Sequence, residues 1–236
     1  MAREPYFEQR QKDRTKPREI KHEKGWSRGP DPPIGGDLPR HYYFQSIYKI
    51  EEQQSSEVKR SMIIETERLI LREYTWEDFD SLYEIVSDAE TMQHYPKPFD
   101  EERTKSWIEW NLQNYEKYGF GLWAVVLKET GEFIGDCGIT IQDIDGENLP
   151  EIGYHIHKRY WRRGFGSEAA KAARDWAFNN TEYNCLYSYM KYTNIGSYST
   201  AVANGMKKVK EYPDEKNGIS YAYAITRKEW EENHRS

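Results

Sequence analysis

A glycine turn in front of a helix constrains the fold of this chain more than any other feature. Gly164 and Gly166 stand directly before residues 169–177, where alanine and tryptophan recur at helical spacing. A backbone without Cβ atoms can approach a ligand closely, and the unpaired amides of a first helical turn favour an anion. Arg162 and Arg163 add positive charge beside the turn. The segment therefore predicts a seat for a phosphate group of the pyrophosphate kind.

Two other interpretations of the turn stay open at this point. An ordinary loop before a helix would need no ligand, and Glu168 would then be a favourable acid in the first turn. The segment also fits the dinucleotide fingerprint G-x-G-x-x-G/A, which would indicate a nicotinamide or flavin site. That fingerprint requires a parallel strand ending at the first glycine. Here residues 158–163 separate the preceding strand from Gly164.

The strands upstream of the turn follow one another as an antiparallel meander. Apolar residues fill 122–127 and 133–141, and the Glu129-Thr130-Gly131-Glu132 hairpin signal lies between them. Further strands are predicted at 63–72 (one or two segments), 151–157, 185–192, 206–211 and 219–225. Helices are predicted to start at Thr75 and Asp100, after the glycine turn, at Ile195 and at Arg227. We expect an α/β fold with a mixed, largely antiparallel twisted sheet of about seven strands.

The length of 236 residues suits one domain plus an appendage. Residues 1–61 carry 13 Lys and Arg against 10 Asp and Glu, whereas the remainder carries 21 against 30. The first segment is polar, rich in proline and without periodicity, so we expect a disordered extension over 1–61 and a folded domain over 62–236. The net charge of -6 disfavours a general nucleic-acid-binding protein.

Several classes of protein are disfavoured by what the sequence lacks. The longest uninterrupted apolar run, residues 122–127, is far shorter than the roughly 20 residues that span a bilayer. Cys137 and Cys185 form no C-x-x-C motif, so we expect no disulfide framework and a cytoplasmic location. His155 and His157 share a strand face, but no third ligand is spaced to join them, and we expect no metal site.

Four segments recur in the order and spacing of one known family: residues 64–72, 151–154, 164–169, and 194–197 followed by Gly205-Met206. On these segments the chain from Met62 to about Glu232 resembles the Gcn5-related N-acetyltransferases (GNAT) of the RimJ/RimL type. The family pattern Gln/Arg-x-x-Gly-x-Gly/Ala has Trp161 at its first position here. The resemblance implies acetyl-CoA as co-substrate, wedged where the sheet splits near its fourth and fifth strands.

The resemblance also implies which residues bind the cofactor. The glycine turn would hold the pyrophosphate, the strand before it would pair with the pantetheine arm through its backbone, and a main-chain amide within 154–156 would polarise the thioester carbonyl. The residues so predicted are Tyr154, His155, Ile156, His157, Arg162, Arg163, Gly164, Phe165, Gly166, Ser167, Glu168 and Asn194.

Acetyl transfer to an amine needs a base, because a primary amine with a pKa near ~10 is protonated at neutral pH. Glu151 is the candidate base, with a solvated acid at a strand end as the alternative. Many family members protonate the thiolate with a tyrosine at the position that is Ala201 here. Ser197 is the candidate replacement and Tyr198 the second choice, although Ser197 could equally serve to bond the helix backbone.

The predicted reaction is direct transfer of acetyl to a primary amine in a ternary complex. A cationic acceptor fits the acidic domain: a protein N-terminus, a polyamine or an aminoglycoside. One alternative is a non-catalytic CoA-binding regulatory module, which the missing tyrosine at Ala201 would suit. Another is a ribosome- or RNA-associated protein that uses the basic tail. The protein could be a monomer or a homodimer.

Overall fold

The computed structural model describes residues 63–234. The disordered extension predicted over residues 1–61, and its RNA-binding alternative, lie outside the described residues. Within them, none of the helices combines the length and the apolar character needed to cross a membrane.

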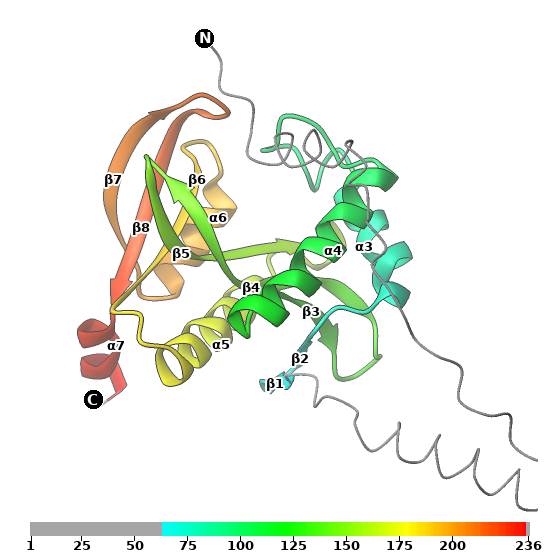
Figure 1. Ribbon diagram of the computed structural model, residues 1–236, viewed down its shortest axis with the longest axis horizontal. Coiled ribbons are helices and arrows are strands. Elements are labelled where there is room, and N and C mark those ends of the chain that lie inside the picture. The colour runs from blue at the N-terminus through cyan, green and yellow to red at the C-terminus, as the bar shows by residue number, and fades with distance from the viewer. Residues whose placement is uncertain (1–62, 235–236) are drawn as a thin grey trace, which may run out of the picture. The chain divides into compact units, whose positions relative to one another are not determined.

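Eight strands form a single sheet in the order β1-β2-β3-β4-β5-β6-β8-β7 (Figure 1). Every neighbouring pair is antiparallel except β5 and β6, which are parallel. The strands are β1 (Ile63–Glu65), β2 (Leu69–Arg72), β3 (Leu122–Leu127), β4 (Phe133–Ile144), β5 (Glu147–Ile156), β6 (Cys185–Lys191), β7 (Lys207–Asp214) and β8 (Gly218–Thr226). The predicted α/β fold with a largely antiparallel sheet is confirmed. The count is one higher than predicted, because residues 63–72 turn back on themselves and form two strands.

The helices begin where the sequence supplies caps. Thr75 and Asp78 form the predicted capping box, and the side chain of Asp100 accepts a hydrogen bond from the amide of Arg103 at 2.9 Å. The described helices are the 3-10 turns η1 (Trp76–Asp78) and η2 (Lys158–Tyr160), and the α-helices α3 (Phe79–Val86), α4 (Glu101–Tyr118), α5 (Phe165–Asn180), α6 (Ile195–Ala203) and α7 (Arg227–His234).

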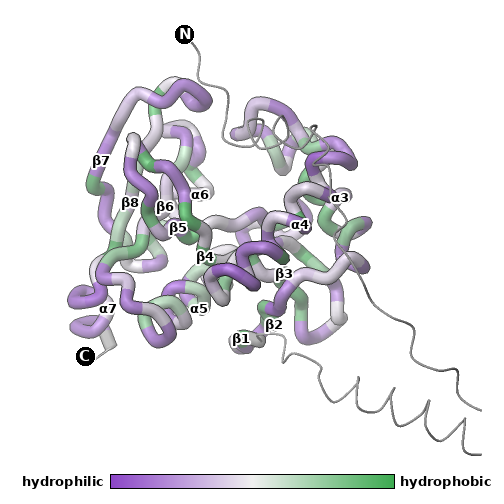
Figure 2. Tube along the Cα trace, in the orientation of Figure 1, coloured by the Kyte–Doolittle hydropathy of each residue, from purple (hydrophilic) through white to green (hydrophobic). Residues whose placement is uncertain are grey.

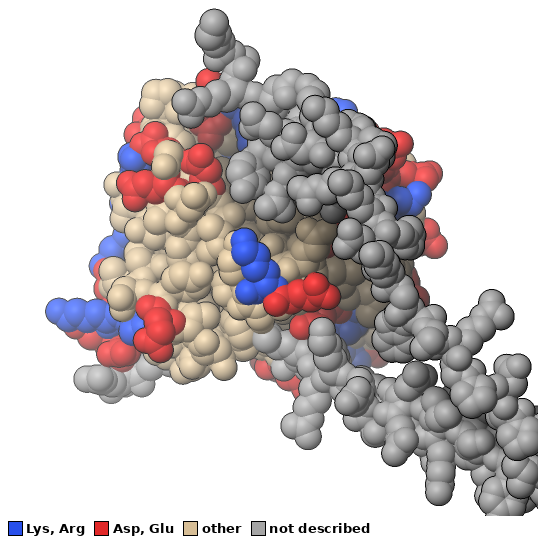
Figure 3. Space-filling view, viewed as in Figure 1, with Lys and Arg blue, Asp and Glu red and all other residues tan. Residues whose placement is uncertain are grey.

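Helices cover both faces of the sheet, because strands such as β3 direct apolar side chains alternately to the two faces. Trp123 and Val125 point into the core cluster beneath α5, whereas Leu122 and Ala124 point into the cluster beneath α3 and α4. Polar residues colour much of α4 and α7 in Figure 2, as expected for helices with one solvent face. On the face seen in Figure 3, acidic and basic side chains lie in separate groups among uncharged residues, and the described residues show no continuous basic stripe.

The sheet opens between β5 and β6. Their register contains one pair in the described chain, Glu151 opposite Tyr187. Helix α5 connects the two parallel strands, so its N-terminus lies beyond the C-terminal end of β5 (Figure 1). This opening corresponds to the predicted split between the fourth and fifth strands when β1 and β2 are counted together.

Candidate active site

The open edge of β5 is the first element of the candidate site. Ile152 still binds β6, because its carbonyl accepts a hydrogen bond from Ser188 Oγ at 2.7 Å. Alternate residues of a strand direct their peptide groups to the same side, so those of Tyr154 and Ile156 face the opening. The register gives them no partner on β6 within the described residues. An extended ligand can therefore bind here as an added strand.

Other predicted backbone contacts of this strand are used within the protein. The amide of His157 donates to the carbonyl of Ile134 and its carbonyl accepts from the amide of Tyr160, both at 2.9 Å. The amide of His155 donates to Asp136 Oδ1 at 2.9 Å. His155 and His157 thus direct their amides into the sheet, away from the opening.

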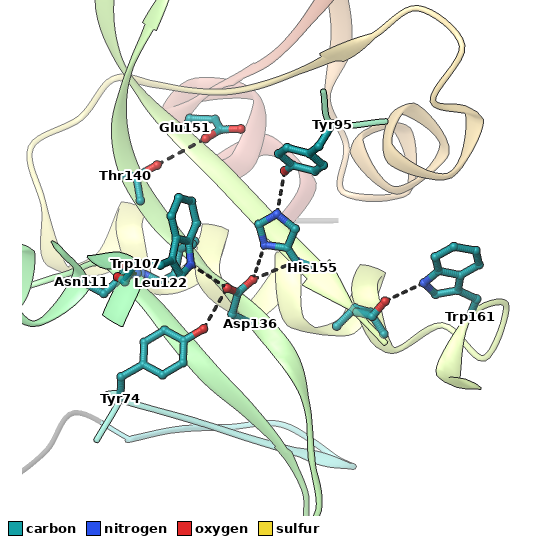
Figure 4. Close-up of polar contacts among 11 residues, drawn as sticks. Tyr74, Tyr95, Trp107, Asn111, Leu122, Asp136, Thr140, Glu151, His155 and Trp161 are labelled. Carbon is teal, nitrogen blue, oxygen red and sulfur yellow. Dashed lines mark hydrogen bonds and ion pairs between the residues drawn. The ribbon is translucent and has the colours of Figure 1, made fainter. Parts of the chain in front are cut away.

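Trp161, the departure from the family pattern, has a structural role. Its indole Nε1 donates a hydrogen bond to the carbonyl of Ile156 at 2.6 Å (Figure 4). This bond ties the end of β5 to the loop that leads to Gly164. The main-chain groups that stay open on the predicted edge are therefore the amide and carbonyl of Tyr154 and the amide of Ile156.

A buried carboxylate lies behind this edge. Asp136 has no exposed surface, and its oxygens accept hydrogen bonds from the Tyr74 hydroxyl at 2.8 Å and from Trp107 Nε1 at 3.3 Å (Figure 4). Its Oδ1 also binds His155 Nδ1 at 2.8 Å, and His155 Nε2 lies 2.6 Å from the hydroxyl of Tyr95. The structure thus forms a continuous chain from Asp136 through His155 to Tyr95.

Charge pairing fixes the protonation of this chain. Burial disfavours the charged imidazole, but the charge and hydrogen bond of Asp136 outweigh it and raise the pKa of His155. Burial likewise opposes the carboxylate, and His155 with Tyr74 and Trp107 outweighs it and lowers the pKa of Asp136. Nδ1 of His155 therefore carries a proton directed at Asp136, and Nε2 is directed at Tyr95.

Glu151, the predicted base, lies where the two strands separate. Its Oε2 accepts a hydrogen bond from Thr140 Oγ1 at 3.3 Å across β4 and β5. Burial raises the pKa of Glu151 to about 7, and the hydrogen bond from Thr140 and the charge of His155 oppose the rise only in part. A carboxylate with this pKa can accept a proton near neutral pH and release it again.

The glycine turn lies where it was predicted, at the N-terminus of α5. Gly164 has a φ of +83°, and Arg162 also adopts the left-handed conformation, with a φ of +59°. The first bond of the helix joins the amide of Glu168 to the carbonyl of Gly164 at 2.9 Å, so the amides of residues 165–167 precede the helical ladder. No side chain among the described residues caps this helix. Arg162 and Arg163 are exposed beside it.

Two predicted members of the turn bind other parts of the protein through their side chains. Glu168 accepts hydrogen bonds from Thr66 Oγ1 at 2.5 Å and from the amide of Arg68 at 2.9 Å, and its Oε2 pairs with the Arg68 guanidinium at 2.6 Å. The ring of Phe165 is buried, with the Arg68 guanidinium 4.3 Å from its centroid. These contacts anchor the start of α5 on the β1–β2 turn.

The first turn of α6 faces β5 across the opening. Asn194 caps the helix, because its Oδ1 accepts a hydrogen bond from the amide of Ser197 at 3.1 Å. The hydroxyl of Tyr154 donates to the carbonyl of Ser197 at 2.8 Å and lies 3.2 Å from Ser197 Oγ. The structure therefore brings Tyr154 and Ser197, two of the predicted residues, together.

Tyr198 and Ala201 differ from Ser197 in their surroundings. The ring of Tyr198 stacks on Tyr223, with centroids 6.5 Å apart and an interplanar angle of 9°. Ala201 is 1% exposed and belongs to the main core cluster. The position that carries a tyrosine in many family members is therefore filled by the core in this chain.

Comparison with known proteins identifies the family. The acetyltransferase (GNAT) domain matches residues 68–207, which contain every candidate site residue. The chain belongs to the GNAT acetyltransferase family. The uncharacterized N-acetyltransferase YnaD of Bacillus subtilis (strain 168) is 31% identical over 181 residues, which cover 72% of this chain and 99% of YnaD.

Solved GNAT structures agree with this assignment. An acetyltransferase from Agrobacterium tumefaciens str. C58 is 29% identical, has a TM-score of 0.62, and is matched over 70% of this chain and 94% of its own. The ribosomal L7/L12 alpha-N-protein acetyltransferase RimL, solved in complex with coenzyme A, is 16% identical with a TM-score of 0.60, over 70% of this chain and 98% of its own. RimL shares the fold alone at this identity.

Membership in the GNAT family decides between the alternatives left open above. This protein is an N-acetyltransferase, whose co-substrate in this family is acetyl-CoA. The dinucleotide interpretation is not supported, because β5 belongs to an antiparallel meander and ends before η2 rather than at Gly164. The uncapped helix start and the open strand edge fit a diphosphate and an extended amide-bearing arm, respectively.

Sequence reasoning missed the residues that hold the site together. Asp136 and Tyr74 were not predicted, and His155 was expected to act through its backbone. The resemblance places Tyr95 and Trp107 in the acceptor-site region between the first two helices, but packing in the core was the alternative and neither residue was given a role. One signal was present: Asp136 is the lone charge in the apolar run 133–141, and such a residue requires a buried partner. Its partner His155 could not be paired with it from spacing alone, because the register depends on the hairpin that joins β4 and β5.

Proposed function

We propose that this GNAT protein transfers the acetyl group of acetyl-CoA to the primary amine of a cationic acceptor, by direct attack in a ternary complex. Glu151 is the general base and Ser197 the proton donor to the leaving thiolate. The observation that carries the proposal is the position of Glu151, at the point where β5 and β6 separate, with a pKa raised by burial to about 7.

The coenzyme would be held by two sets of main-chain groups. The amides of residues 165–167, with Arg162 and Arg163 beside them, would bind the diphosphate. The open groups of Tyr154 and Ile156 would bind the pantetheine arm, and Asn194 would contact it from α6. Acetyl-CoA supplies the activated acetyl thioester, and an amide of this edge would polarise its carbonyl.

Glu151 would remove the proton that keeps the acceptor amine unreactive. At neutral pH about half of this carboxyl is ionised, given its pKa of about 7, and the ionised form attracts the ammonium group. After the proton moves to Oε1 or Oε2, the neutral amine can attack the thioester carbonyl. That proton leaves to water through the opening, and Glu151 would then accept the second proton that the nitrogen loses as the amide forms.

Ser197 would return a proton to the thiolate sulfur. Its Oγ lies 3.2 Å from the hydroxyl of Tyr154, whose own proton is directed at the Ser197 carbonyl. Ser197 would therefore regain its proton from water that enters through the opening. Tyr198 is the second choice, and its stacking on Tyr223 favours Ser197 as the first.

The acceptor class follows from charge. The residues beyond 61 carry 30 acidic against 21 basic side chains, which favours a cationic acceptor such as a polyamine, an aminoglycoside or a protein N-terminus. RimL, which shares the fold, is named as an alpha-N-protein acetyltransferase. The cytoplasmic location and the choice between monomer and homodimer stay predictions.

A panel experiment tests the proposal. The full chain would be incubated with acetyl-CoA and, in turn, spermidine, an aminoglycoside and a tetrapeptide with a free N-terminal serine, and release of the CoA thiol would be followed. We expect release with at least one amine, and a rate lowered about 10²-fold or more with Glu151→Gln. A thermal shift with acetyl-CoA but none with NAD or FAD is expected as well. Absence of both the shift and the thiol would contradict the proposal.

A further inference from the structure

Tyr95 lies in the segment between α3 and α4, and its hydroxyl reaches His155 on β5. Two phenols bind the Asp136–His155 pair, and they differ in exposure. Tyr74 is 2% exposed and holds Asp136 from the interior, whereas Tyr95 is 40% exposed and holds His155 from the side of the opening. A buried phenol at one end serves packing. At the other end the hydroxyl of Tyr95 is desolvated and bound to His155, and the exposed part of the residue gives a ligand access to it.

The cost of burying Asp136 indicates that this arrangement is not ordinary packing. A carboxylate removed from water is expensive unless it is paired and fully hydrogen-bonded, and apolar residues of similar volume are often as stable. The backbone of β4 next to Asp136 also approaches His155 closely. A Cβ atom at Gly135 would lie 2.0 Å from the carbonyl oxygen of His155, so only glycine allows this approach of β4 to β5.

The orientation of His155 follows from this pairing. Asp136 accepts from both its amide and its Nδ1, so the ring cannot rotate without breaking a contact to a buried charge. Its Nε2 is thereby aimed at the Tyr95 hydroxyl, 2.6 Å away. The ring of Tyr95 also lies against the imidazole, with centroids 5.3 Å apart.

The Tyr95 hydroxyl lies within the electrostatic reach of Glu151. Desolvation of the hydroxyl, followed by the negative charges of Glu151 and Asp136, raises the pKa of Tyr95, so the phenol keeps its proton at neutral pH. Figure 4 shows Tyr95 and Glu151 on the same side of the Asp136–His155 pair. A neutral phenol beside a carboxylate can orient an ammonium or amine group through its oxygen.

We propose that Asp136 and His155 are positioning residues that hold the hydroxyl of Tyr95 on the side of the sheet that carries Glu151, and that Tyr95 contacts the acceptor amine. The inference rests on the proposed function, because Glu151 marks the place where the amine would lose its proton. Tyr95 thereby determines the binding of the acceptor and leaves the binding of acetyl-CoA unaffected.

The test uses three variants of the full chain and one matched control. Tyr95→Phe removes one hydroxyl, His155→Gln removes the imidazole, and the third variant combines both changes. Tyr118→Phe is the control, since Tyr118 is also 40% exposed and lies at the end of α4. Acceptor KM, acetyl-CoA KM and kcat would be measured with the amine that gives the fastest release in the panel above.

Tyr95→Phe is expected to raise the acceptor KM at least about tenfold, as for a lost hydrogen bond to a charged group, and to leave the acetyl-CoA KM within twofold. His155→Gln should act in the same direction. The double variant should be no worse than the more affected single variant, because the two residues act through one contact. Tyr118→Phe should change none of these constants.

Hydrogen exchange of the amides of residues 88–99 supplies a readout that needs no acceptor. Tyr95→Phe and His155→Gln should both accelerate it relative to wild type and to Tyr118→Phe. An acceptor KM within twofold of wild type in Tyr95→Phe, effects that multiply in the double variant, or unchanged exchange would each overturn the inference. If the wild type acetylates no amine of the panel, the proposed function fails separately. The exchange experiment then still decides whether the contact between His155 and Tyr95 holds the segment of residues 88–99.

Discussion

Glu151 lies opposite Tyr187 at the single register pair that joins β5 to β6 in the described chain. The residue is half-buried, and the two strands separate beyond this pair. Burial in this position raises the pKa of Glu151 to about 7. A carboxylate at the point where the sheet splits can thus be desolvated and still be accessible to a ligand.

The activity should depend on pH through Glu151. Because the base must be ionised to accept a proton, kcat/KM is expected to rise with pH and to level off above a pKa of about 7. Glu151→Gln should lower kcat by about 10²-fold or more and remove this limb of the profile. Steady-state rates between pH 5.5 and 9 check both expectations.

The stability of the same variant separates loss of chemistry from loss of fold. A carboxyl whose pKa rises from about 4.3 in the unfolded chain to about 7 on folding makes the folded state less stable as pH rises through that interval. Glu151→Gln removes this effect, so its Tm at pH 8 should equal or exceed that of wild type. A lower Tm together with lower activity would assign Glu151 a structural role instead.

A carboxylate introduced at the proposed diphosphate site should weaken the binding of acetyl-CoA without lowering the stability of helix α5. Ser167→Asp puts a negative charge in the first turn of α5, where the helix dipole favours it, so the free protein should keep its Tm or gain a little. The same charge should repel the diphosphate and raise the Kd of acetyl-CoA at least about tenfold. Acetyl-pantetheine, which lacks the diphosphate, is the control and should bind both proteins alike.

Protonation of the thiolate should be sensitive to Ser197. Ser197→Ala is expected to reduce kcat about tenfold or more with an unchanged Kd for acetyl-CoA, while Tyr198→Phe should have the smaller effect because its ring is stacked on Tyr223. Single-turnover rates at saturating acetyl-CoA measure the difference. Full kcat in both variants would exclude this pair as the proton donors.

Asp136→Asn should destabilise the fold by about 3–5 kcal/mol, because it leaves buried His155 without its counter-charge. The pKa of His155 is raised in the folded state, so its contribution to stability is full below about 6.5 and is lost as pH rises through the folded pKa. The penalty should therefore be larger at pH 6 than at pH 9. Urea unfolding at both values, with exposed Asp80→Asn as the control, checks this.

Much of the fold could be predicted from local signals, because those signals act within a few residues. The capping box at Thr75, the cap at Asp100, the hairpin at Gly131 and the glycine turn at Gly164 all lie where the sequence predicts them. The family resemblance supplied the order of the remaining elements. The extra strand arises because residues 63–72 fold back after Glu65.

The interior of the site could not be predicted in the same way. Asp136 and His155 lie 19 positions apart and Tyr95 lies 60 positions before His155, so their contact depends on the register of β4 with β5 and on the path of the segment between α3 and α4. Trp161 illustrates the same limit. Its indole replaces a polar residue of the family pattern by bonding the strand end, which spacing alone does not reveal.

The burial of Ala201 restricts how this chain could have changed over evolutionary time. A tyrosine at this position would have to enter a filled core at 1% exposure, and overpacking of that kind costs about 1–3 kcal/mol or more. A single mutation to tyrosine at this position would therefore lower the free energy of unfolding. Under the proposed mechanism, the hydroxyl that protonates the thiolate must therefore come from another position.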